Sequence, residues 1–303
     1  MINLKLLKVL ILASSVLVVG CGGGSSSDAA AGVVPAGNTN TGGNTNTGGN
    51  TNTGGAANFT IATNSDSGFS AFNRKVEVFG VPIYAVATVD DQRLLHTANI
   101  MAQYLDNDED GVVDNQQVIN EMINSNAFLV MWKSETDLNN FNPPSGFKGQ
   151  DLGNDETIPS WHTNGHLGPF DASLEEVWHL ITSAGYANAY PSVFGESTVS
   201  ALAVAMDQAR GGHFLAIPNP YPPGAWYTYD DVTCDYNCMV TEYFYWSMTS
   251  ILGAQENRLS DISQEWDLNT RVLVQTTDTP IYNLLTDPQY KLPSTLPDGS
   301  YQN

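Results

Sequence analysis

The sequence predicts an α+β fold in one globular domain over residues 58–303, and three observations predict it. Residues 76–89 are rich in β-branched and apolar side chains, as strands are. Several later segments carry apolar residues at helical spacing. Strand-like and helix-like segments do not alternate regularly along the chain, which favours α+β over a doubly wound α/β sheet.

The first half of the domain is predicted to hold strands and two helices on either side of an acidic loop. Residues 76–89 are expected to form one or two strands, and residues 92–105 a helix capped by an aspartate. A second helix is expected over 115–125, followed by a short buried strand over 127–132. The acidic loop is therefore expected to lie between two helices.

The second half is predicted to be mainly helical. Residues 142–170 are rich in Pro, Gly, Asn and Asp and are expected to form a long loop. Helices are expected over 172–184, 198–210 and 239–254. The Pro-rich segment 287–303 is expected to wrap over the surface of the domain.

The N-terminus carries an export signal. Lys5 and Lys8 precede an apolar run over 9–19 that is too short to span a bilayer, and residues 1–20 are therefore predicted to be a signal peptide. The small residues before Cys21 resemble the bacterial lipobox. This resemblance implies that Cys21 is lipidated and becomes the first mature residue, whereas the alternative is an ordinary signal peptide with an incidental cysteine.

Residues 21–57 are predicted to be a flexible linker. Within it, residues 38–55 repeat Asn-Thr-Asn-Thr-Gly-Gly three times and offer no apolar side chain to bury. Gly22 directly after the cysteine resembles lipoproteins that are sorted to the bacterial outer membrane. We therefore expect a membrane-anchored protein that faces the periplasm or the cell surface, tethered by its lipid.

The charge of the chain excludes one large class of partner. The sequence has 32 acidic residues against 11 basic ones, which gives a formal net charge of −21. A chain this acidic repels the phosphates of nucleic acids and of anionic lipids. Cations are the partners that this charge favours.

Two cysteines remain after the lipobox, Cys234 and Cys238 in Cys-Asp-Tyr-Asn-Cys. In an exported protein this spacing favours a local disulfide. The alternative is a metal site, but two thiolates do not complete a zinc shell.

A calcium site is predicted in the acidic loop. Asp106, Asp108 and Asp110 alternate, Gly111 permits a sharp turn, and Asp114 follows. This spacing resembles the EF-hand and dockerin loops. The resemblance implies the Ca²⁺ ligands Asp106, Asp108, Asp110, Val112 through its carbonyl, Asp114 and Gln117. The alternative is a solvated acidic turn, in which the carboxylates would repel one another without a cation.

The last position of this loop departs from the EF-hand pattern. Gln117 stands where an EF-hand has a bidentate Glu, so it offers one neutral oxygen and a weaker site. Since exported proteins meet about millimolar calcium, a weak site of this kind is expected to be structural.

The segment Glu-Glu-Val-Trp-His places titratable side chains on one helix face. Glu175 and His179 are four residues apart, and Glu176 and His179 are three apart, so all three side chains adjoin in a helix. One interpretation is structural: Ser173 and Glu176 form a capping box, Asp171 is a further N-cap candidate, and His179 is a core histidine.

The other interpretation is a metal site. The segment resembles the zincin motif His-Glu-x-x-His, with Glu175 in place of the first histidine. The resemblance implies a zinc peptidase in which Glu175 and His179 bind Zn²⁺ and Glu176 is the general base. A carboxylate is a usable zinc ligand, although the missing first histidine weakens the match.

A downstream helix offers a third ligand. Glu242 begins the string Glu-Tyr-Phe, which resembles the corresponding helix of gluzincin and lethal-factor-like peptidases. The resemblance implies Glu242 as the third zinc ligand and Tyr243 or Tyr245 as the donor to the oxyanion. The alternative for Glu242 is a favourable interaction with the helix dipole.

Two histidines in the predicted loop are further candidates for zinc. His162 and His166 are four residues apart, and either one could replace the missing histidine beside His179 and Glu242. The alternative is that both are surface residues. His213, the histidine that follows His179 in the chain, is a weaker candidate.

The sequence therefore predicts an exported, membrane-tethered calcium-binding protein with a zinc metallopeptidase-like hydrolase site and a peptide or protein substrate. Two alternatives remain open. One is a non-catalytic, calcium-stabilised surface module for binding or adhesion. The other is a histidine-based transition-metal-binding protein that uses His162, His166 and His179.

Overall fold

The computed structural model describes residues 59–139 and 141–302. The predicted signal peptide, Cys21 and the repeat linker lie outside these residues. The strands are β1 (Ala62–Thr63), β2 (Arg74–Val78), β3 (Val81–Ala85), β4 (Ala127–Trp132) and β5 (Lys148–Gly153). The longer helices are α1 (Asp91–Leu105), α2 (Gln116–Asn124), α4 (Ser173–Leu180), α7 (Ala201–Ala209), α8 (Tyr236–Leu252), α10 (Arg271–Thr277) and α11 (Thr279–Leu285). The short helices are α3 (Ser160–Thr163), α5 (Ala187–Ala189), α6 (Pro191–Phe194) and α9 (Leu259–Ile262). Helices and strands thus combine in a mixed α and β fold, as predicted.

The five strands form one sheet in the order β1-β2-β3-β4-β5. β2 and β3 form an antiparallel hairpin in which Val78 pairs with Val81. β3 and β4 are parallel, with Ile83 opposite Leu129, and β4 and β5 are parallel as well. Because parallel neighbours need a crossover, α1 and α2 form the connection between β3 and β4. This β-α-β crossover is not among the features that the sequence predicts.

The prediction of a continuous loop over 142–170 was wrong, because β5 lies within it. The strand reads Lys-Gly-Gln-Asp-Leu-Gly and has neither β-branched residues nor apolar alternation. Its place in the sheet comes from close packing, since a Cβ on Gly149 would lie 2.1 Å from Cζ of Phe128. Only glycine allows the Phe128 ring to lie this close to the neighbouring strand.

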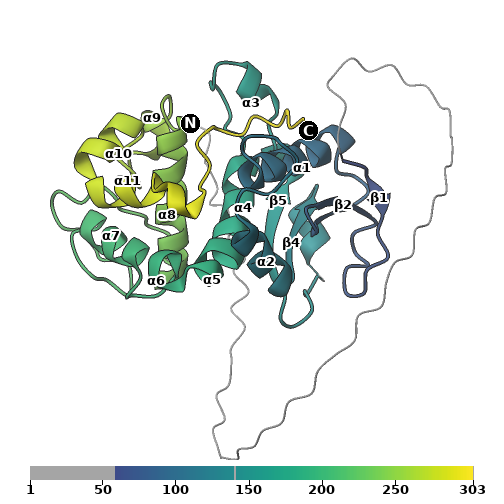
Figure 1. Ribbon diagram of the computed structural model, residues 1–303, viewed down its shortest axis with the longest axis horizontal. Coiled ribbons are helices and arrows are strands. Elements are labelled where there is room, and N and C mark those ends of the chain that lie inside the picture. The colour runs from purple at the N-terminus through teal and green to yellow at the C-terminus, as the bar shows by residue number, and fades with distance from the viewer. Residues whose placement is uncertain (1–58, 140, 303) are drawn as a thin grey trace, which may run out of the picture. The chain divides into compact units, whose positions relative to one another are not determined.

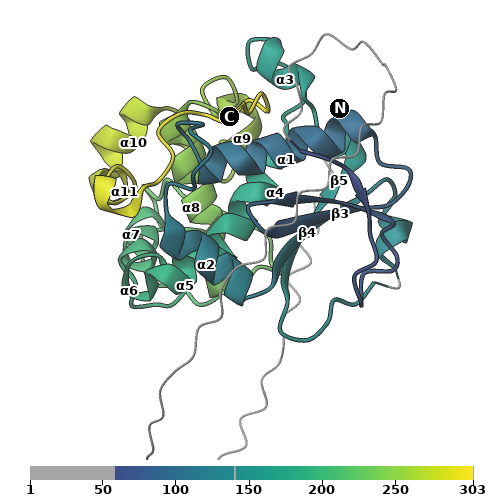
Figure 2. The same cartoon turned by 45° about the vertical axis from the view of Figure 1, so that its right-hand side comes forward.

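Apolar side chains cover both faces of the sheet. Alternate residues of a strand point to opposite faces, and Ile83 belongs to the main core whereas Tyr84 belongs to a second cluster with Phe128. α1 and α4 pack on the main-core side (Figure 2). The sheet therefore holds α4, the helix with the predicted zinc residues, against a rigid support.

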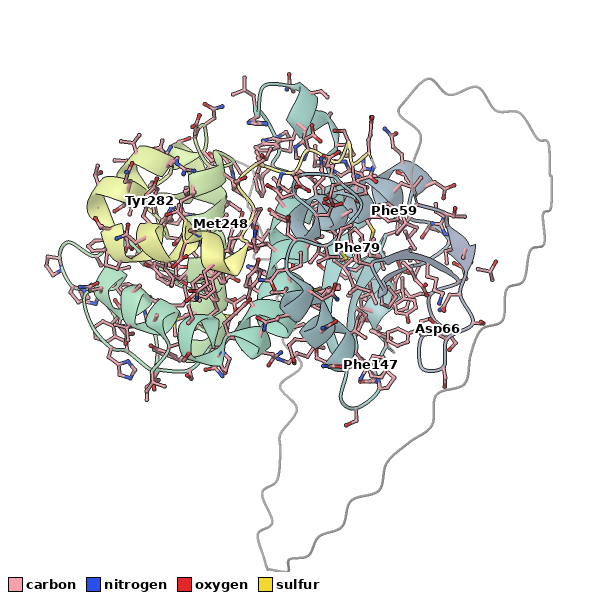
Figure 3. The ribbon with its side chains drawn as sticks, in the orientation of Figure 1. Phe59, Asp66, Phe79, Phe147, Met248 and Tyr282 are labelled. Atoms are coloured by element: carbon pink, nitrogen blue, oxygen red, sulfur yellow. A yellow bond between two sulfur atoms is a disulfide. The ribbon has the colours of Figure 1, made fainter. Side chains whose placement is uncertain are left out.

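The helices from α6 to α11 gather on the left in Figure 1, and α4 lies between them and the sheet. α8 is buried on nearly every side and packs against α4, α7, α10 and α11. Met248 of α8 and Tyr282 of α11 lie among these helices, whereas Phe79 and Phe147 lie on the side of the sheet (Figure 3). A helix hydrophobic all round is an interior helix, which accounts for the aromatic sequence of α8.

The helix that begins as α4 does not end at residue 184, where the predicted helix over 172–184 ends. Residues Ile181–Tyr186 continue as a π-helical turn. A Cβ on Gly185 would lie 2.6 Å from Cγ1 of Val118, so this glycine permits close packing on α2 instead of terminating a helix. Gly211, by contrast, has a φ of +76° directly after α7, as a C-terminal glycine does.

Residues 291–302 form a C-terminal strap over α1 and the acidic loop, in agreement with the predicted surface wrapping (Figure 1). The side chain of Gln103 donates to Asp298 and accepts from the strap's backbone. The hydroxyl of Tyr301 donates to Asp106 over 2.5 Å. The strap therefore joins the end of the domain to its first helix.

Among residues 59–139 and 141–302, the helices are all too short or too polar to cross a lipid bilayer.

Candidate functional site

α4 supplies three titratable side chains to one place. Its apolar residues Leu174, Val177 and Trp178 are fully buried, and this orientation carries Glu176 and His179 inward, each 2% exposed. Ligand atoms of Glu175, Glu176 and His179 lie within 4.8 Å of one another. The adjacency predicted from helical spacing is confirmed.

The capping-box interpretation of this segment was wrong. α4 begins after Ala172, which forms no side-chain cap, and the hydroxyl of Ser173 donates to Asp171 over 2.7 Å. Glu176 also has another partner, because Gln150 of β5 donates to its Oε2 over 2.6 Å. Glu176 is thus oriented by the sheet and is free of a capping role.

α8 brings Glu242 to the same place. Asp235 caps the helix by accepting from the Cys238 amide, and Gly253 ends it with a φ of +93°. Between these ends Glu242 is 2% exposed, and its Oε2 lies 3.5 Å from Nε2 of His179. The predicted meeting of Glu242 with the α4 residues is therefore present, and we name Glu175, His179 and Glu242 the Glu–His centre.

His179 stands between carboxylates without a proper hydrogen bond at Nε2. Its Nδ1 lies 3.9 Å from Oε2 of Glu176, and within the described part of the chain Nε2 makes no hydrogen bond. Burial opposes a charged imidazole, but the carboxylates of Glu242 and Glu176 outweigh it and raise the pKa of His179. A buried polar atom without a partner costs free energy, so Nε2 of His179 is an available site for a bound ligand.

The carboxylates of the centre repel one another. Burial and the Glu242 carboxylate raise the pKa of Glu175 to about 8, although His179 opposes the shift. Burial and Glu242 also raise the pKa of nearby Glu265 to about 7. Two carboxylates and one imidazole are donors that zinc accepts, and a divalent cation would relieve the repulsion. The residues present therefore fit a zinc ion.

The oxyanion role predicted for Tyr243 requires correction. Its hydroxyl is fully buried and donates to Oδ2 of Asp278 over 2.6 Å. Tyr245 is buried as well, but its ring lies edge-on to His179 at a centroid distance of 5.4 Å, and its hydroxyl accepts from the side chain of Gln255. Burial and the Glu175 carboxylate raise the pKa of Tyr245, so its phenol stays protonated. Of the two predicted tyrosines, Tyr245 is the one beside the imidazole.

The structure places His162 in a different cluster. Nε2 of His162 and Nε2 of His96 lie 2.8 and 2.7 Å from the same oxygen, Oδ2 of Asp171. His166 stacks on Trp161 at a centroid distance of 4.2 Å. The proposed replacement of the missing zincin histidine by His162 is therefore not what the fold provides.

Two members of this second cluster escaped the sequence analysis. His96 lies on α1 and Asp171 directly before α4, and 75 residues separate them in the chain. Asp171 was considered only as an N-cap, and its Oδ1 does accept from the Ser173 amide. No local spacing joins these residues, so only the fold could bring them together.

The remaining predicted histidine is a surface residue. Nδ1 of His213 lies 2.6 Å from Oδ2 of Asp207, and the side chain is 48% exposed. The cysteines of the predicted disulfide, Cys234 and Cys238, are joined as expected.

The acidic loop curls around its first aspartate. Asp106 is fully buried, and its Oδ2 accepts from the amide of Gly111 over 2.8 Å. Gly111 has a φ of +86°, the conformation that the sharp turn requires. Oxygen atoms of Asp106, Asp108 and Asp110 lie within 4.8 Å of one another. The carboxylates of Asp106, Asp108 and Asp110, which the sequence predicts to face one ion, therefore lie close together.

The rest of the loop follows the expected pattern in part. Oδ2 of Asp114 accepts from the Asn107 amide across the loop. The side chain of Val112 is 64% exposed, as suits a residue expected to ligate only through its carbonyl. Gln117 lies exposed in the first turn of α2, which Asn115 caps. Three carboxylates thus form the core of the loop.

Comparison of the chain with protein-family models, with curated proteins and with solved structures found no match.

Proposed function

We propose that this chain is an exported, lipid-anchored hydrolase whose Glu–His centre binds Zn²⁺. One observation carries the proposal: Nε2 of His179 is buried without a hydrogen bond and faces Glu242 at 3.5 Å, with the carboxylates of Glu175 and Glu176 beside it. A group of three carboxylates around one imidazole is stable only with a cation or a shared proton. Zinc suits this donor set.

The roles of the residues follow from their positions. Glu175, His179 and Glu242 would hold the ion, which when bound polarises a carbonyl and lowers the pKa of water. Glu176 takes the proton of the attacking water and passes it to the leaving amine of a peptide. Gln150 holds Oε2 of Glu176 at 2.6 Å and so fixes the direction of the base.

Tyr245 completes the proposed mechanism. Its phenol keeps its proton because burial and the Glu175 carboxylate raise its pKa, and its ring contacts His179. A neutral phenol is a donor to the oxyanion that forms when water attacks the peptide carbonyl. We assign this role to Tyr245 in place of Tyr243.

The base has a direct test. Glu176→Gln keeps the shape and the acceptor for Gln150 but cannot take a proton from water. With zinc loaded, we expect this variant to keep its metal and to lose at least about 100-fold in the hydrolysis of a fluorogenic peptide library. Glu256→Gln, at an exposed position, is the matched control. A Glu176→Gln variant as active as the wild type would refute the assignment.

The burial of the centre favours a second candidate function. Glu176, His179 and Glu242 are each 2% exposed, which suits a structural metal with little substrate access. The chain would then be a non-catalytic, calcium-stabilised binding module. This candidate predicts that zinc raises the melting temperature of the wild type while the wild type cleaves no peptide of the same library.

Calcium is the second ion in the proposal. Desolvation raises the pKa of Asp108, and the carboxylates of Asp110 and Asp114 raise it further, so like charges repel one another inside the acidic loop. The loop packs between α1 and α2 and under the strap, so an ion there would hold three parts of the domain together. The proposed role of Ca²⁺ is therefore structural, at the outer membrane where the lipid on Cys21 would hold the chain.

A further inference from the structure

The cluster of His96, His162 and Asp171 has more hydrogen-bond donors than its carboxylate can serve. Oδ2 of Asp171 has three close partners: Nε2 of His96 at 2.7 Å, Nε2 of His162 at 2.8 Å and the Ser173 hydroxyl at 2.7 Å. Oδ1 accepts from the Ile158 amide over 2.8 Å. A carboxylate oxygen has two lone pairs in its plane, so three donors on Oδ2 are one too many.

The cluster is also shut off from water. Asp171 is fully buried, and the side chains of His96 and His162 are 6% and 3% exposed. Its ligand atoms lie within 4.8 Å of one another. Nδ1 of His162 makes no hydrogen bond within the described residues. The three side chains are therefore buried with their ligand atoms facing one another.

We propose that His96, His162 and Asp171 form a second transition-metal site, separate from the Glu–His centre, that binds Zn²⁺ through two imidazole nitrogens and one carboxylate oxygen. An ion bonded to Nε2 of each histidine removes the two N–H donors and takes a single lone pair of Oδ2. The Ser173 hydroxyl then keeps the other lone pair. In a neutral imidazole the proton moves from Nε2 to Nδ1, so the net charge of each ring is unchanged.

The adjustment that zinc requires is small. Tetrahedral zinc with bonds of about 2.0 Å places its ligand atoms about 3.3 Å apart. The two nitrogens would therefore move outward by about half an ångström from their present positions.

The C-terminal strap closes this site. A Cβ on Gly299 would lie 2.1 Å from Nδ1 of His96, so the strap's backbone lies directly against the ring. Asn99 donates to the Gly299 carbonyl over 2.8 Å, and Gln103 accepts from the Gly299 amide over 2.8 Å. The strap thus positions His96, and a side chain at residue 299 would displace one or the other.

Zinc stoichiometry tests the proposal on the full chain. After loading with Zn²⁺ and gel filtration, we expect about two zinc ions per wild-type chain by elemental analysis and by native mass spectrometry. His96→Asn and His162→Asn should each hold about one fewer, because asparagine is a poor zinc ligand. Gly299→Ala should also weaken this site without removing a ligand. His213→Asn, at an exposed histidine, is the control and should hold as many ions as the wild type.

The outcomes separate this site from the proposed hydrolase centre. If His179→Ala keeps all its zinc while His96→Asn loses one ion, the second site stands and the Glu–His centre falls. If His96→Asn and His162→Asn hold as much zinc as the wild type, the second site is refuted. A wild type that binds a single ion, lost both in His179→Ala and in His96→Asn, refutes it as well. Near-ultraviolet circular dichroism checks that each variant is folded.

Discussion

Nε2 of His179 on α4 lies 3.5 Å from Oε2 of Glu242 on α8, and both residues are buried between the sheet and the C-terminal helices. Residues 181–235 connect the two helices, and a connection of this length does not by itself bring α4 and α8 into contact. Their contact places an imidazole and three carboxylates at the junction of the two halves of the domain.

Asp151 on β5 should make the protein less stable as the pH rises. Burial and the Glu176 carboxylate raise the pKa of Asp151 from 3.8 to about 6. The folded state therefore favours the protonated form, so the contribution to stability is full below about pH 4 and is lost as the pH rises through about 6.

The variant Asp151→Asn isolates this effect, because it keeps an acceptor for the Trp132 indole N–H, which now donates to Asp151 over 2.7 Å. We expect it to be more stable than the wild type by about 1–2 kcal/mol at pH 7.5 and equal to it at pH 4. Urea unfolding across this range measures the difference. If the difference in the free energy of unfolding between Asp151→Asn and the wild type does not change with pH, Asp151 does not titrate as described.

Removal of calcium should loosen the domain. If Ca²⁺ at about 100 times its dissociation constant fills the acidic loop, it stabilises the folded state by about 2.7 kcal/mol, which corresponds to about 5–10 °C in melting temperature. Chelation should lower the melting temperature of the wild type by this amount. Asp108→Ala should abolish the response, and Asp261→Ala, at an exposed aspartate outside the loop, should preserve it. Equal melting curves with calcium and with chelator would count against the site.

Lipid on Cys21 should decide where the protein is found. Expressed in a bacterium, the wild type is expected to enter the detergent phase on phase separation, because an acyl chain adds about 0.8 kcal/mol of membrane affinity per buried CH₂. Cys21→Ser should remain in the aqueous phase, while Ser27→Ala, in the same linker, should behave like the wild type. Partition of Cys21→Ser into detergent would mean that another feature anchors the chain.

Local pattern predicted the elements whose residues carry their own signal. The helix expected over 92–105 is α1 (Asp91–Leu105), and the strand expected over 127–132 is β4 (Ala127–Trp132). β5 escaped because its polar residues take strand form only through pairing with β4 and through the contact of Gly149 with Phe128. Such tertiary contacts leave no local mark in one sequence.

The residues of the candidate sites also fall into those that local spacing brings together and those that only the fold brings together. Glu175, Glu176 and His179 share a helix turn, so their adjacency follows from the helical repeat. The partnership of His96 with Asp171 depends on how α1 packs against α4, which no spacing encodes. The resemblance to gluzincins pointed to Glu242, which the structure does bring to His179, and it left Tyr243 and Tyr245 open, of which Tyr245 lies beside the imidazole.

A substitution of Glu242 on α8 tests the proposed zinc binding of the Glu–His centre independently of the residues on α4. Glu242→Gln keeps the size of the side chain in its buried place but removes the charge that faces His179. We expect this variant to bind zinc at least about tenfold more weakly than the wild type, as measured by competition with a chelating dye. Glu256→Gln, at an exposed carboxylate outside the Glu–His centre, is the control. An unchanged zinc affinity in Glu242→Gln would remove this residue from the centre.

The most direct measurement of the central claim is the zinc content of His179→Ala. The wild type, purified without chelator and loaded with Zn²⁺, should carry about one more zinc ion per chain than this variant, because the remaining carboxylates hold zinc poorly at neutral pH. His213→Ala, which removes an exposed imidazole, should match the wild type. If His179→Ala holds as much zinc as the wild type, or if the loaded wild type holds none, the Glu–His centre is not a zinc site.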